Sequence, residues 1–113
     1  MKPYQLDFTF EAAKDVRDCY DYLARYIGGT GDVSVAERFI EELDKILKNI
    51  LFFPRGFAFC EDVDLREAGV RKAHFMGRYK YKIFFHIIDD TIIIDMVCHD
   101  LKNYNKILAE RKK

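Results

Sequence analysis

The sequence predicts a mixed α+β fold with the element order β-α-α-β-β-β. Three observations support this class: a short alternating segment near the N-terminus, two long amphipathic segments after it, and three strand-like runs in the last third of the chain. Half of the 113 residues are apolar, which argues against disorder. A chain of this length fits one domain, spanning 1–113, with a core of its own.

The first predicted element is a strand that leads directly into a helix. Tyr4, Leu6 and Phe8 alternate with polar residues, as in a strand buried on one face. From 10 to 27 the apolar side chains recur at steps of three and four residues, while charged residues that include Asp15 fill the opposite face. This pattern predicts an amphipathic helix, which the glycine-rich stretch at 28–31 ends.

A second amphipathic helix is predicted from Ser34 to Phe52, with Pro54 and Gly56 closing it. Two helices joined by a short glycine-rich turn form an antiparallel hairpin. The acidic segment that follows, 57–68, contains Phe57, Phe59 and Cys60. Its composition fits either a packed connection or a contact surface for a partner, and the sequence leaves both open.

Three strands are predicted in the last third of the chain, at Val70–Phe75, Tyr79–Ile88 and Thr91–Cys98. The Asp89-Asp90 pair turns the second strand into the third, which gives a three-stranded antiparallel meander. A short C-terminal helix or tail completes the fold. The cysteines are expected to be core or near-core fillers.

The middle strand of the meander has two different faces. Tyr81, Ile83 and Phe85 lie on an apolar face, with Tyr79 and Ile87, and this face is predicted to receive the helical hairpin. Lys80 and Lys82 begin the other face and cannot be buried unpaired, so this end is predicted to be open to water or to a ligand. Phe84 and Ile88 on the same face are expected to be exposed apolar surface.

Charge is distributed unevenly along a chain whose formal net charge is zero. Residues 69–113 carry ten Lys or Arg against five acids, a balance of +5, so residues 1–68 carry −5. Such asymmetry predicts an acidic partner for the basic end.

Several classes of protein are disfavoured by the composition. The three cysteines are widely separated and lack CxxC spacing, which favours reduced thiols in a cytoplasmic protein and gives no support for a metal site. No apolar run approaches the ~18 residues of a membrane span, so no membrane association is expected. No phosphate loop or catalytic triad pattern is present, and no cofactor is predicted.

Taken in order, these elements resemble the RelE/ParE superfamily, the toxin components of type II toxin–antitoxin modules, which include plasmid stabilisation proteins. The short motifs are individually unspecific, but their order and spacing are not. They are the helix start at 11–15, Ala36 with Phe39, the helix end at 53–56, the strand opening at 69–72, the strand at 81–87, Val97-Cys98-His99 and Tyr104 to Leu108.

The resemblance implies a growth-inhibiting toxin that a cognate antitoxin neutralises, with two alternative activities. One branch of the superfamily inhibits DNA gyrase, and the other cleaves mRNA on the ribosome without a metal. The long hairpin, the neutral charge and lysines at two positions where the RelE-like branch carries arginines favour the ParE-like, gyrase-inhibiting branch.

If the chain is a ribonuclease, the resemblance assigns its catalytic groups to the meander and the segment after it. Cations would hold the scissile phosphate, and His or Tyr side chains would transfer protons or stack on a base. The catalytic candidates are Lys72, His74, Lys82, His99, Lys102 and Tyr104. The candidates for target or nucleic-acid binding are Arg71, Arg78, Lys80 and Lys106.

Each candidate also has a structural interpretation: the basic residues can be the solvated face of a sheet, and Tyr104 can anchor the C-terminal segment. Two functional alternatives therefore stay open, an inactive family member that acts as a binding module and an unrelated α+β domain that binds acidic ligands. The expected partners are a cognate antitoxin and either ribosome-bound mRNA or DNA gyrase, with a homodimer or a toxin–antitoxin hetero-oligomer left open.

Overall fold

The computed structural model describes residues 3–27, 33–75, 80–99 and 104–111. Its elements confirm the α+β class and the predicted order. They are β1 (Gln5–Phe8), α1 (Phe10–Tyr22), a π-helical turn (Leu23–Ile27), α2 (Ser34–Phe52), a 3₁₀ turn (Pro54–Gly56), α3 (Val63–Glu67), β2 (Arg71–Phe75), β3 (Tyr81–Ile88), β4 (Thr91–His99) and α4 (Tyr104–Arg111).

The four strands form one sheet in the order β1-β4-β3-β2. β2, β3 and β4 are antiparallel neighbours and form the predicted meander, whereas β1 pairs in parallel with the outer edge of β4. At the predicted β3–β4 turn Asp89 has a φ of +54°, a left-handed conformation that aspartate tolerates better than most residues. Tyr79, predicted in the middle strand, lies outside the described residues.

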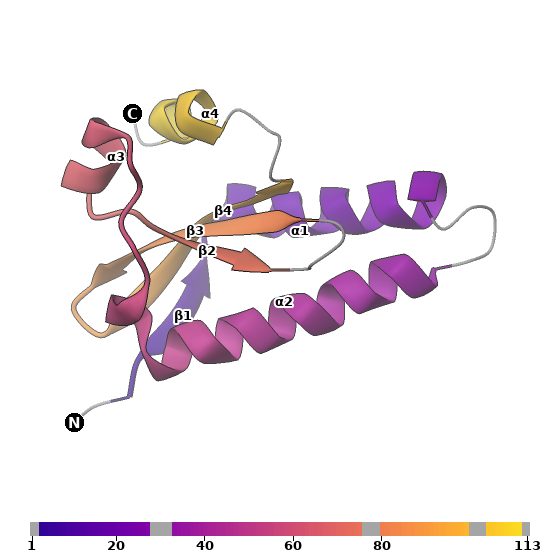
Figure 1. The fold of residues 1–113 in the computed structure, drawn as a ribbon, viewed down its shortest axis with the longest axis horizontal. Coiled ribbons are helices and arrows are strands. Elements are labelled where there is room, and N and C mark those ends of the chain that lie inside the picture. Colours follow the sequence, from indigo (N-terminus) through magenta and orange to yellow (C-terminus); the bar gives the residue numbers. More distant parts are fainter. Residues whose placement is uncertain (1–2, 28–32, 76–79, 100–103, 112–113) are drawn as a thin grey trace.

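The helical hairpin covers one face of the sheet, as predicted. Figure 1 shows α1 and α2 side by side and running in opposite directions. Phe39 of α2 contacts Tyr81 of β3 with ring centroids 5.0 Å apart, and the core between the layers also buries Ile83 and Phe85. The α2 bounds match the predicted helix, but the end of the first helix differs because Leu23–Ile27 is a π-helical turn. No helix within the described ranges is long and apolar enough to cross a membrane.

The opposite face of the sheet is covered by α3 and α4 (Figure 1). Leu65 of α3 and Leu108 of α4 are buried there, against Phe84, Met96 and Cys98 of the sheet. The prediction that Phe84 is exposed is therefore wrong: its side chain is completely buried because Tyr104 stacks on it at 4.4 Å. Ile88, farther along β3, is 55% exposed, as predicted.

An ion pair across the fold ties α4 to α1. The Arg111 guanidinium donates to both carboxylate oxygens of Asp15 at 2.7 and 2.8 Å and to the Asp95 carbonyl at 3.1 Å. Asp15 also accepts the Val97 backbone N–H at 3.1 Å. Since β1 pairs with β4 only as far as Ile94, Asp15 supplies the acceptor that a neighbouring strand would otherwise provide. The interpretation of Asp15 as a solvated helix residue is wrong, because it is only 8% exposed.

The segment 57–68 packs on the fold through Phe57, Cys60 and Leu65. Phe57 meets Phe85 edge-on with centroids 5.9 Å apart, and Cys60 is fully buried. Asp62 caps α3 by accepting the Leu65 N–H at 3.1 Å. Only Phe59 among the aromatic and sulfur-containing residues of this segment is exposed, at 43%.

Burial of Cys60 predicts a stability loss at alkaline pH. Burial raises the pKa of its thiol from 9.0 to about 11, so the unfolded chain releases this proton at lower pH than the folded one. This contribution to the free energy of unfolding is therefore fully present below pH 9 and is lost as pH rises through the folded value. Urea denaturation between pH 8 and 11 should show the decline, and Cys60→Ala should make it shallower. An identical slope in that variant would contradict the assignment.

Candidate functional site

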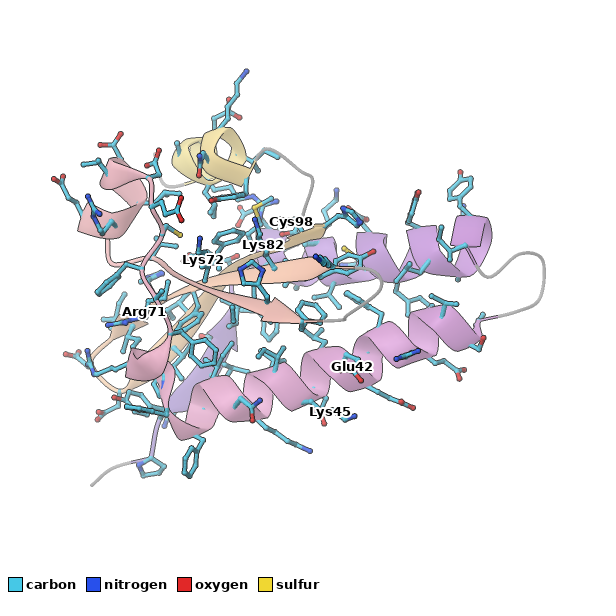
Figure 2. All side chains as sticks on the ribbon, in the orientation of Figure 1. Glu42, Lys45, Arg71, Lys72, Lys82 and Cys98 are labelled. Atoms are coloured by element: carbon cyan, nitrogen blue, oxygen red, sulfur yellow. The ribbon has the colours of Figure 1, made fainter. Side chains whose placement is uncertain are left out.

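Three candidate residues converge on the sheet face that carries α3 and α4. In the β2–β3 register, His74 lies opposite Lys82, and Lys72 lies opposite Phe84. Because residues two apart on a strand point to the same side, all three candidates share the face of the buried Phe84. Figure 2 shows Lys72 and Lys82 on this side of the sheet, and Arg71 apart from them.

Tyr104, at the first position of α4, joins this group. Its ring stacks on Phe84 with centroids 4.4 Å apart and an interplanar angle of 28°. The Lys82 ammonium lies 4.8 Å from the centre of the same ring, within the range of a cation–π interaction. We call Lys72, His74, Lys82 and Tyr104 the basic face. Tyr104 therefore fits both interpretations, as an anchor and as a site residue. Its ring packs α4 on Phe84 and also contacts Lys82.

The carboxylate beside Lys72 neutralises the charge of this lysine only weakly. The Lys72 Nζ lies 3.7 Å from the Glu61 Oε1, but the Glu61 side chain is 89% exposed, so solvent screens this pair strongly. The Lys72 side chain itself is 18% exposed. Lys80, just before β3, and Lys106 on α4 are both exposed. They add positive charge two residues from Lys82 and two residues from Tyr104 in the sequence.

Other candidates lie elsewhere in the fold. The Arg71 Nη1 donates to the backbone carbonyls of Phe57 at 2.6 Å and Arg55 at 3.2 Å, so its side chain fastens the 57–68 segment to β2. His99 pairs with Tyr81 on the hairpin side of the sheet, ring centroids 5.3 Å apart, and lines a cleft of about 410 Å³ between α1 and the sheet. Arg78 and Lys102 lie outside the described residues.

A histidine–aspartate pair was not among the predicted site residues. The His86 Nδ1 lies 2.7 Å from the Asp95 Oδ2, and both side chains are largely buried. The β3–β4 register shifts between Phe84 and Phe85, which makes Asp95 the extra residue of a β-bulge. The signal in the sequence was a carboxylate within the apolar run of the last strand, because a buried carboxylate needs a partner.

This arrangement can bind an anion more readily than it can assemble a complete catalytic set. Lys72 and Lys82 offer positive charge, and His74 is exposed beside Lys82. His99, the second histidine candidate, is separated from them by the thickness of the sheet. Among the described residues, no group of three His, Cys, Asp or Glu side chains that could hold a metal ion is found.

Removing the Tyr104 ring is expected to loosen α4. Tyr104→Ala loses the stack on Phe84 and the contact with Lys82, whereas Tyr104→Phe keeps both ring contacts. Hydrogen exchange of the α4 amides should accelerate about tenfold or more in the alanine variant, consistent with a loss of roughly 1.5 kcal/mol in local stability. Unchanged α4 exchange in Tyr104→Ala would show that Leu108 and Arg111 hold the helix without the ring.

Comparison with known proteins gives consistent results. The family model described as "ParE toxin of type II toxin-antitoxin system, parDE" matches residues 6–104. Among solved structures, a chain of the chromosomal ParDE toxin–antitoxin system from P. aeruginosa aligns with a TM-score of 0.66 and 20% identity, covering 85% of this chain and 95% of that one. The E. coli toxin RelE, as a double arginine-to-alanine mutant in the free state, aligns with a TM-score of 0.60 and 22% identity over 98% of both chains. The comparison with curated proteins found no match.

Proposed function

The chain belongs to the ParE toxin family of type II toxin–antitoxin systems, and from this premise we propose that it arrests growth by inhibiting DNA gyrase. The observation that carries the proposal is the match of residues 6–104 to the ParE model. We further propose that residues 1–113 act as a single domain in the cytoplasm and that a cognate antitoxin neutralises the toxin in a hetero-oligomer.

The geometry of the basic face supports a binding mechanism. Lys72 and Lys82 present cations beside a ring that is already stacked on Phe84. An acidic surface of gyrase, or the phosphates of the DNA it holds, would be attracted to these cations and would contact Tyr104 at their edge. An inhibitor of this kind needs affinity and position but no proton transfer, which agrees with the separation of His99 from the lysines.

Gyrase supercoiling and growth are the direct tests of this function. The purified chain is expected to inhibit supercoiling of relaxed plasmid by gyrase, and its induction without the antitoxin should arrest growth and damage the nucleoid. Co-expression of the cognate antitoxin should restore growth. Arrest with undamaged DNA and active gyrase would refute the proposal.

Ribosome-dependent mRNA cleavage is the second candidate function. Lys72, His74, Lys82 and Tyr104 lie on one face, as that mechanism requires, and the fold aligns with RelE over 98% of the chain. Primer extension on mRNA from the same induced culture separates the two activities. Cleavage at codon boundaries that disappears in Lys82→Ala would establish the ribonuclease, and intact mRNA would exclude it. Unimpaired growth with folded protein would indicate an inactive binding module.

A further inference from the structure

A second group of residues, at the end of α2 and in the segment that follows, carries unusually exposed aromatic side chains. Phe52 and Phe53 at the end of α2 are 90% and 62% exposed, and Phe59 in the following segment is 43% exposed. Arg55 lies in the turn after Phe53, and Arg71 of β2 contacts both Phe59 and Arg55. We call these five residues the aromatic patch. A phenyl ring forms no conventional hydrogen bonds with water, so its exposure to solvent is unfavourable. Three exposed rings close together in the sequence therefore need an explanation.

Direct contacts join Phe59, Arg71 and Arg55, and a separate contact positions the Phe53 ring. The Phe53 ring lies against Gly56, where an added Cβ would be only 2.9 Å from the ring Cδ2. The Arg71 guanidinium lies 3.9 Å above the centre of the Phe59 ring and donates to the Arg55 carbonyl at 3.2 Å. The Arg55 Nε donates to the Tyr4 hydroxyl at 3.2 Å. The Phe53 and Phe59 rings and the two guanidinium groups therefore already have contacts within the chain, whereas Phe52 is the most exposed member of the patch.

The patch is also positively charged. Within the described part of the chain, neither Arg55 nor Arg71 contacts a carboxylate. Burial first, and then the charge of Arg55, lower the pKa of Arg71, which means that the two cations oppose each other. A carboxylate placed between them would relieve this repulsion and form charge-assisted hydrogen bonds.

The composition of the patch fits a protein partner better than a nucleic acid. Aromatic residues and arginine are enriched at the centres of protein–protein interfaces, whereas lysine is depleted there. Nucleic-acid binding relies on neutralising many phosphates along the backbone, and the patch offers two cations. Arg71 lies on the hairpin side of β2, opposite the side that carries Lys72 and His74, so the patch does not extend the basic face.

We propose that the aromatic patch binds an acidic segment of the cognate antitoxin, with an aliphatic or aromatic side chain packed on the phenyl rings and a carboxylate paired with Arg55. The identification of this partner as the antitoxin rests on the proposed function. The antitoxin would then hold the toxin at a surface separate from the one that meets the target. Neutralisation would gain affinity from a site that the target does not compete for.

The first test measures the affinity of the cognate antitoxin for this chain. Phe52→Ser/Phe53→Ser and Arg55→Glu are each expected to weaken binding about tenfold or more, because buried aromatic and arginine anchors dominate interface energies. Phe10→Ser is the matched control, since Phe10 is 77% exposed outside the patch and should bind as the unmodified protein does. Circular dichroism and thermal melting verify that each variant is folded. Equal affinity of the patch variants and the control would overturn the inference while leaving the proposed function intact.

A peptide probe tests the patch independently of the antitoxin. The peptide acetyl-Asp-Phe-Asp-Leu-Glu-amide should shift the amide resonances of residues 52–59 in ¹⁵N-labelled protein, and the shifts should vanish with Arg55→Glu. The same peptide with lysine at its acidic positions should produce none. If no antitoxin binds the toxin, the proposed hetero-oligomer fails, and the peptide result alone decides the patch. No shifts at 52–59, or shifts there only with a single-stranded oligonucleotide, would overturn the inference.

Discussion

Replacement of Asp15 by alanine is expected to lower the free energy of unfolding by about 3 kcal/mol or more, the range measured when one partner of a buried ion pair is removed. The substitution leaves the Arg111 guanidinium, with a side chain only 20% exposed, without its bidentate acceptor. It also leaves the Val97 N–H on the unpaired part of β4 without the acceptor it has at 3.1 Å. Urea denaturation followed by far-ultraviolet circular dichroism measures this loss.

Asp18→Ala provides the matched control one turn along the same helix. Asp18 pairs with Lys14 at 3.3 Å, but both side chains are more than 60% exposed, so this variant should lose less than about 1 kcal/mol. Arg111→Ala should be costly but milder than Asp15→Ala, because Asp15 still accepts the Val97 N–H in that variant. A double-mutant cycle then isolates the coupling of the pair. Equal losses in Asp15→Ala and Asp18→Ala would show that the pair contributes nothing beyond a surface contact.

Local periodicity predicted the four strands and the two long helices because each of them has a clear apolar pattern of its own. The second helix, the meander and the contact of Tyr81, Ile83 and Phe85 with the hairpin all follow from spacings within one segment. The burial of Phe84 did not follow, because the ring that covers it belongs to Tyr104, twenty residues along the chain and on a different element. α3 was also missed, since it is five residues long and its capping residue Asp62 lies in an acidic segment.

In the candidate site, too, contacts that follow from spacing within one segment were predicted, and contacts between residues far apart in the sequence were not. The alignment of Lys72, His74 and Lys82 on one face follows from strand alternation and register. The Asp15–Arg111 pair joins residues that are 96 positions apart in the sequence. In a helical projection of α1, Asp15 lies on the polar face. That polar position is buried because α1 lies along the edge of β4 where β1 has ended. Only the arrangement of elements, and no spacing along the chain, reveals such a contact.

Exchange of Lys72 and Lys82 for glutamate is expected to abolish growth arrest. The two lysines supply the cations at the centre of the basic face, and reversing both charges places like charges against an acidic target at a cost of several kcal/mol. Binding to gyrase should therefore weaken about 100-fold or more, or mRNA cleavage should cease if that is the activity. Colony counts after induction without the antitoxin measure the effect, together with the corresponding assay on the purified protein.

The control for this experiment is Lys45→Glu/Lys48→Glu on α2. It makes the same change in net charge on the outer side of the hairpin, where both lysines are more than 70% exposed (Figure 2 labels Lys45), and growth arrest should persist. Because Lys72 is partly buried beside Glu61, the neutral variant Lys72→Gln/Lys82→Gln separates loss of charge from loss of folding. If the basic-face variants stay folded and toxic while the α2 control behaves identically, the target binds elsewhere, and the cations of the basic face are a solvated surface.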